Sequence, residues 1–268
     1  MLKNEKDEFG VLYAHMEDLC RRTEQGEVAS SAFLSPRELH YASRYLERLG
    51  VCVYSSGGYE GAERQKIYLL PDYIELPDTE RENLLPRLSK FGFDGGICAL
   101  RIQGSGYRVL THRDFLGSLL ALGIEREVLG DILVDADGHA ATLLCEGHMV
   151  PFLQQELIFV ANDKIRLRSI PLDELVIPKL NFERLCDTVA SARLDCVVAA
   201  LCALSREKAR SAVEGGLVEM NYESEDRPDR EVLSGSILSV RGFGRYRVLR
   251  LEDRTKKGRI RIEAEKYR

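Results

Sequence analysis

The sequence of 268 residues has no tryptophan, and none of its seven cysteines belongs to a Cys-x-x-Cys pair. A thiolate zinc site or a disulfide framework would need closer, paired spacing, so neither is expected. No apolar run approaches the ~18 residues that span a bilayer, and the start, MLKNEKDEFG, lacks the apolar core of a secretory signal. We therefore expect a cytoplasmic protein with no membrane insertion, in which most cysteines are small buried residues in a reducing compartment.

Signals for catalysis and for metal binding are also incomplete. Cys145 and His148 form a single Cys-x-x-His without a second pair of ligands. The triplet that starts at His112 resembles the catalytic loop of protein kinases, but no glycine-rich loop and no Asp-Phe-Gly accompany it. The sequence predicts no catalytic residue, no metal ligand and no cofactor.

Charge is distributed unevenly along the chain. The net charge is -5, yet residues 182–268 carry 18 basic against 15 acidic groups. From Leu238 onward the balance sharpens to 11 basic against 4 acidic groups. An acidic body with a basic end favours a polyanion bound at that end, although charge alone is equally compatible with a solvated tail.

Hydrophobic patterns predict an α+β protein with three domains, at residues 1–74, 75–180 and 181–268. In the first, a helix begins at Ser35, because Pro36 suits the first helical position and Glu38 completes a capping box. Strands are expected at residues 51–55 and 65–70. This domain is predicted to be a small α+β unit without recognisable chemistry.

The central domain is expected to follow the order strand, helix, strand, strand, helix, strand. The apolar run at residues 97–103 is the first strand, and Thr111 caps the first helix. The pair Asp137-Gly138 predicts a hairpin turn between the two middle strands. This order indicates a ferredoxin-like sandwich, the shape of RNA-recognition-motif domains. Its strands carry no aromatic ring on which a base could stack, so we expect a scaffold or protein-contact role for it.

The last domain has two helical apolar stripes followed by strands, and basic residues gather where its second helix begins. Backbone N–H groups and the helix dipole favour anions at such a position, so cations there indicate a phosphate site. Arg206 and Lys208 oppose that dipole, and a residue that weakens its own helix is better explained by a partner. The predicted RNA-contacting residues are Arg193, Arg206, Lys208, Arg210, Asn221, Arg241, Arg245, Lys256, Lys257 and Arg259.

Several of these residues fall in a recognisable pattern. Arg193-Leu194-Asp195 opens one helix, Ser205-Arg206 opens the next, and a turn runs from Gly216 to Asn221. The pattern resembles the RNA-binding domain named after ribosomal small-subunit protein four, called here the S-four domain. The resemblance implies that residues 181–268 form an S-four-type domain that binds structured RNA by shape.

The chain as a whole resembles the YlmH family. The resemblance rests on THRDFLGSLLALGIEREVLGDILV in the central domain, together with RGFGRYRVL and TKKGRIRI near the end. It implies a protein that binds rRNA and tRNA, is associated with the large ribosomal subunit, and acts in the rescue of stalled nascent chains.

Two alternatives remain open from the sequence. Arg-Leu-Asp also occurs in pseudouridine synthases, where the aspartate is catalytic, so an RNA-modifying enzyme is one alternative. Asp195 opens a helix inside the binding domain, however, which favours a capping or ion-pairing role. The other alternative is a protein-interaction adaptor whose basic end meets an acidic partner.

Overall fold

The computed structural model describes residues 3–74, 96–178, 183–254 and 258–267, together with residues 85, 88 and 93. By its contacts the chain divides into two compact units, Met1–Pro178 and Lys179–Arg268. Helices and antiparallel sheets occur in both, so the fold class is α+β, as predicted. A further division of the first unit near residue 74 stays a prediction.

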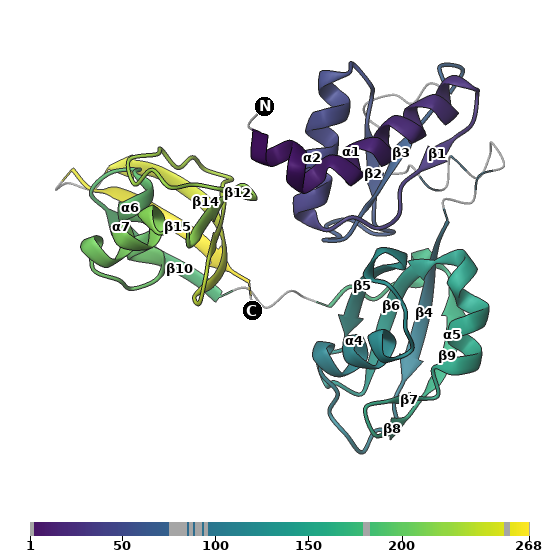
Figure 1. Cartoon of the computed structure of the whole chain (residues 1–268). Helices are drawn as coiled ribbons and strands as arrows, with labels where there is room; N and C mark the ends of the chain where they lie inside the picture. The colour runs from purple at the N-terminus through teal and green to yellow at the C-terminus, as the bar shows by residue number, and fades with distance from the viewer. Residues whose placement is uncertain are drawn as a thin grey trace. The chain divides into compact units, whose positions relative to one another are not determined.

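The first unit begins with two helices packed on a small sheet (Figure 1). The elements are α1 (Lys3–Glu24), β1 (Ala29–Ser30), α2 (Pro36–Arg48), β2 (Tyr54–Ser56) and β3 (Lys66–Leu69). The predicted capping box closes α2, since the Ser35 hydroxyl accepts from the Glu38 amide at 3.3 Å and the Glu38 carboxylate accepts from the Ser35 amide at 2.7 Å. The strand expected from residue 51 begins only at Tyr54, because pairing with β3 starts there.

The rest of the first unit is a four-stranded sheet with helices. Its elements are β4 (Ile97–Gln103), α4 (His112–Ala121), β5 (Leu129–Val134), β6 (Ala140–Glu146), α5 (Val150–Glu156), β7 (Phe159–Val160), β8 (Asp163–Lys164) and β9 (Arg166–Ile170). The sheet order is β5-β6-β4-β9, with antiparallel neighbours throughout. This is the order of a ferredoxin-like sandwich, so the prediction from the sequence is confirmed.

The two faces of this sheet have different neighbours. On one face, Leu100 and Ile102 of β4 pack in a single cluster with Phe115 of α4 and Leu153 of α5. On the other face, Ala99 packs with side chains of the N-terminal part, including Phe33 and Tyr68. The N-terminal part therefore covers part of the face that RNA-recognition-motif domains leave open.

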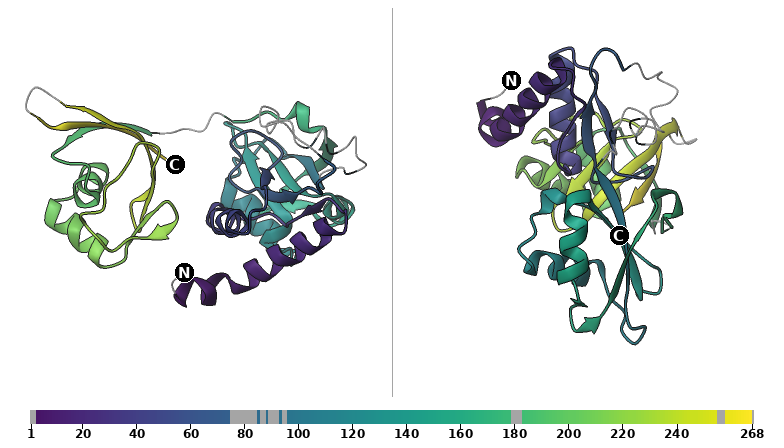
Figure 2. Two further views of the ribbon diagram at one scale, coloured as in Figure 1. Left: turned by 90° about the horizontal axis from the view of Figure 1, so that it is seen from above. Right: turned by 90° about the vertical axis from the view of Figure 1, so that its right-hand side faces the viewer.

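The second unit is a six-stranded sheet with two helices on one side, as Figure 2 shows. Its elements are β10 (Glu183–Val189), α6 (Leu194–Leu201), α7 (Arg206–Glu214), β11 (Val218–Met220), β12 (Glu223–Ser224), β13 (Ile237–Val240), β14 (Gly244–Arg254) and β15 (Ile260–Lys266). The strand order is β10-β15-β14-β13-β11-β12. Val197 and Val213 of the helices share a core with Val248 and Ile262 of the sheet.

Candidate nucleic-acid interface

A buried carboxylate organises the start of α6. Asp195 is only 2% exposed. Its Oδ1 accepts from Nε of Arg193 at 3.1 Å, and its Oδ2 accepts from Nε of Arg206 at 3.2 Å. The side chains of Arg193 and Arg206 are 40% and 62% exposed. Asp195 thus anchors one arginine at the start of α6 and another at the start of α7, and both side chains remain partly exposed.

The chemistry of Asp195 follows from these contacts. Burial raises the pKa of the carboxyl, but hydrogen bonds from Arg193, Arg206 and the amide of Cys196 outweigh it, so the pKa lies below its usual value. The carboxylate is therefore ionised throughout the neutral range. The capping or ion-pairing role expected from the sequence is confirmed.

The remaining predicted cations of α7 divide between two sides of the helix. Arg210 lies one turn after Arg206 on the same side, and its Nε donates to Glu214 at 2.8 Å. Arg210 also lies close enough to Arg193 for the two positive charges to repel each other. Lys208, two positions after Arg206, projects from a different side of the helix, while its amide donates to the capping Ser205 hydroxyl. The structure gathers Arg193, Arg206 and Arg210, and leaves Lys208 apart from them.

Asn221 has a structural task in the hairpin between β11 and β12. Asn221 and Tyr222 both have positive φ, at 52° and 68°, and form a two-residue turn of the kind that matches strand twist. The side-chain oxygen of Asn221 accepts from the backbone N–H of Ile237 at 2.9 Å. The backbone N–H of Asn221 in turn donates to the Ile237 carbonyl at 2.8 Å. An RNA contact by Asn221 stays a prediction.

Arg241 and Arg245 form a second group beside a shallow groove of about 450 Å³. Arg241 follows β13, and its amide donates to the carbonyl of Leu217 at 2.9 Å. The Arg245 guanidinium carbon lies 6.0 Å from the centre of the Tyr222 ring and 5.7 Å from that of Tyr267. These cation–π contacts hold Arg245 in place, and the sequence reasoning did not identify either tyrosine.

The last predicted cations lie on and near β15. Lys256 and Lys257 are outside the described residues. Arg259 is exposed, but its Nε donates to the hydroxyl of Thr188 at 2.9 Å, which ties the start of β15 to β10. The outer face of this sheet is of mixed charge, because Arg250 lies opposite Glu263 in the strand register.

An aspartate that holds two arginines gives a pH signature that can be measured. Because the folded-state pKa of Asp195 is depressed, its stabilising contribution is present above the unfolded pKa of about 3.9 and is lost as the pH falls through the folded value. We expect Asp195→Asn to destabilise the second unit by about 1–3 kcal/mol at neutral pH and to remove this acid-sensitive component. Urea denaturation followed by circular dichroism across pH 2–7 tests it, and equal pH slopes for both proteins would contradict the assignment.

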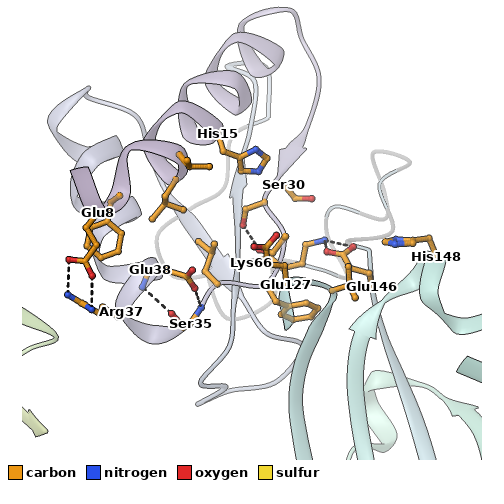
Figure 3. Close-up of a pocket in the computed structure, with 18 residues that line it drawn as sticks. Glu8, His15, Ser30, Ser35, Arg37, Glu38, Lys66, Glu127, Glu146 and His148 are labelled. Atoms are coloured by element: carbon orange, nitrogen blue, oxygen red, sulfur yellow. Dashed lines mark hydrogen bonds and ion pairs between the residues drawn. The ribbon is translucent and has the colours of Figure 1, made fainter. Parts of the chain in front are cut away.

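A larger cavity, of about 860 Å³, lies in the first unit (Figure 3). Two ion pairs lie in its lining. The Lys66 ammonium lies 2.8 Å from the Glu146 carboxylate, and Arg37 lies 3.0 Å from Glu8. The lining also holds Glu38 and Glu127, so carboxylates outnumber cations there, and an excess of negative charge does not attract a polyanion.

Other site types find little support among the described residues. No group of three or more His, Cys, Asp or Glu side chains in them could hold a metal ion. Burial raises the pKa of the Cys145 thiol to about 12, with smaller contributions from Cys98 and Glu146, so this thiol stays protonated. Among the residues that the structure describes, no helix is long and apolar enough to cross a bilayer.

Comparisons with known proteins identify the family. One family model, "YlmH, N-terminal", matches residues 13–74, and another, "Putative RNA-binding domain in YlmH", matches residues 96–174. A solved structure of cell division protein ylmH from Streptococcus pneumoniae is 23% identical, with a TM-score of 0.48, and the match covers 63% of this chain and 94% of that one. The Ribosome-associated protein quality control protein P2 of Bacillus subtilis (strain 168) is 31% identical over 246 residues, which cover 91% of this chain and 90% of that protein. With two family models and a full-length relative in agreement, the chain belongs to the YlmH family.

Proposed function

We propose that this protein is a non-catalytic RNA-binding protein that holds structured RNA through the second unit, which is of the S-four type. The observation that carries the proposal is the pair of partly exposed arginine side chains, Arg193 and Arg206, fixed on one buried carboxylate. Guanidinium groups suit phosphate because their N–H donors are planar and paired, and fixing them in advance lowers the entropy lost on binding.

The placement of the sequence motif supports the S-four assignment. Arg193-Leu194-Asp195 lies at the start of α6, and Ser205-Arg206 at the start of α7. The turn that contains Asn221 follows at the tip of the β11–β12 hairpin. Each part of the motif thus occupies an element boundary.

We further propose that the RNA is ribosomal and transfer RNA on the large subunit, and that the protein acts in the cytoplasm on stalled nascent chains. The name of the Bacillus subtilis relative, a ribosome-associated quality control protein, supports this role. The description of the central family model supports RNA binding. The role of Asp195 speaks against the pseudouridine-synthase alternative, since a carboxylate that is 2% exposed and held by two arginines is poorly placed to attack a base.

The proposal is tested by the salt dependence of binding. If about five phosphates are held, the affinity of the full chain for labelled tRNA should fall roughly a hundredfold between 50 and 200 mM salt. A flat titration would refute phosphate-led binding. In a pull-down from cells, nuclease treatment should release the partners, whereas an adaptor for acidic proteins would keep them. Sequencing of RNA cross-linked in cells then identifies the site.

A further inference from the structure

The open half of the central sheet is distinct in chemistry from its covered half. The strand register places Ile170, Ala99 and Leu144 in one row, which packs against the N-terminal part. The next rows along the same face are polar. There Arg101 donates to Asp135 at 2.7 Å and to the Thr142 hydroxyl at 3.3 Å, so its charge is matched.

The unmatched charge on this half lies on the edge strand β9. Arg168 is the register partner of Arg101, and Arg166 is the partner of Gln103. Both arginines alternate with residues that pack toward the helices, Ile165 and Leu167, and so project to the open face. Within the described ranges, no ion pair or hydrogen bond engages the exposed side chains of Arg166 and Arg168.

A fixed loop next to these arginines presents an aromatic ring. The loop leaves β4 at Gln103, directly opposite Arg166. The Ser105 amide donates to Asp163 at 2.9 Å, and its hydroxyl donates to the same carboxylate. A Cβ at Gly104 would lie 2.7 Å from the Asp163 carboxylate, so only glycine permits this approach. The loop then exposes 98% of Tyr107 to water.

Two exposed, unmatched arginines and a fully exposed tyrosine match what single-stranded nucleic acid requires. Phosphates need cations, and unpaired bases need a ring on which to stack. An acidic protein segment could use the same side chains, because Arg and Tyr are common at protein interfaces. RNA is favoured by the family model that matches residues 96–174, which is described as an RNA-binding domain. The aromatic ring that the four strands of this sheet lack is present on the loop instead.

We propose that Arg166, Arg168 and Tyr107 form a second RNA contact, in which the guanidinium groups hold phosphates and the tyrosine ring stacks on an unpaired base. The inference rests on the proposed RNA-binding function and extends it to the first unit. It gives the protein two contacts on one RNA or on neighbouring RNA segments, each weaker alone than both together.

The test measures binding of the full chain to a fluorescent RNA hairpin with an unpaired loop, across a salt series. R166Q/R168Q should lower the slope of log affinity against log salt by about 1.4, because each phosphate of a single strand contributes about 0.7. Y107A should weaken binding about five- to a hundredfold, while Y107F should bind as the wild type. The matched control, R21Q/R22Q, removes two exposed arginines from the end of α1 and should leave the slope unchanged.

The outcomes separate this contact from the proposed function. All three residues are exposed, so thermal unfolding of these variants should match the wild type. If R166Q/R168Q and Y107A bind as the control does while variants at Asp195 lose affinity, the second contact is wrong and the proposed function stands. If the wild type binds no RNA, both fail. If R166Q/R168Q loses a protein from a pull-down that nuclease does not affect, the surface serves an acidic protein and the proposal is overturned.

Discussion

Glu146→Ala is expected to destabilise the first unit by about 3–5 kcal/mol, because it leaves a buried cation without its partner. The Lys66 side chain is 3% exposed and its Nζ lies 2.8 Å from the Glu146 carboxylate. The nearby Phe33 ring, 6.0 Å from Nζ, offers only a weak substitute. Lys66 lies on β3 and Glu146 at the end of β6, so the pair also joins the two sheets of this unit.

A charge-balanced variant makes this prediction specific. In K66M/E146L both charges are replaced by apolar groups of similar volume, and stability should return to the wild-type value or above it. Asp18→Ala, which removes an exposed pair with Arg21, should change stability by less than about 1 kcal/mol. Urea denaturation followed by circular dichroism measures all three. A Glu146→Ala protein as stable as the Asp18→Ala control would show that the pair contributes nothing.

The second large effect is expected on RNA affinity. Replacing the arginines at Asp195 by neutral side chains removes two charge-assisted phosphate contacts, which corresponds to roughly a hundredfold weaker binding. Simple removal of Arg193 and Arg206 would also leave the buried carboxylate unpaired and unfold the site. The informative protein is therefore D195N/R193Q/R206Q, in which amides replace the charged groups and can hydrogen-bond to each other.

The matched control for this triple variant lies on the outer face of the same unit. R184Q/R250Q/E263Q makes the same change in net charge with exposed residues of β10, β14 and β15. Filter binding with labelled tRNA should show the large loss only for the variant at Asp195. An equal loss of tRNA affinity in both variants would show that net charge, and not the arginines at Asp195, determines the binding.

Local signals explain which elements could be predicted from the sequence. The capping boxes at Ser35 and Thr111 use residues three positions apart, so both helix starts are visible in the chain itself. The hairpin turn at Asp137-Gly138 is likewise a local signal, because the turn requires a positive φ, here 69° at Gly138, and glycine adopts one readily. The strand β10, in contrast, was missed. Most of its residues are exposed, so it has no apolar alternation, and its pairing with β15 connects residues more than 70 positions apart.

The same contrast applies to the candidate site. Arg193 and Arg206 could be selected because each begins a helix, but their common anchor depends on how α6 and α7 pack. The rings that hold Arg245 come from Tyr222 and Tyr267, which no local pattern connects to it. Tyr107 was overlooked for a different reason. Rings for base stacking are expected on the strands of such a domain, whereas this ring is on a loop.

The contact of Phe33 and Tyr68 with Ala99 and Leu144 has a consequence for how such proteins diverge. The segments matched by two separate family models share one hydrophobic core, so a change of side-chain volume on either side must be compensated on the other. Neither segment can be exchanged for an unrelated module without opening that core to solvent. We therefore expect the two segments to occur together in related chains.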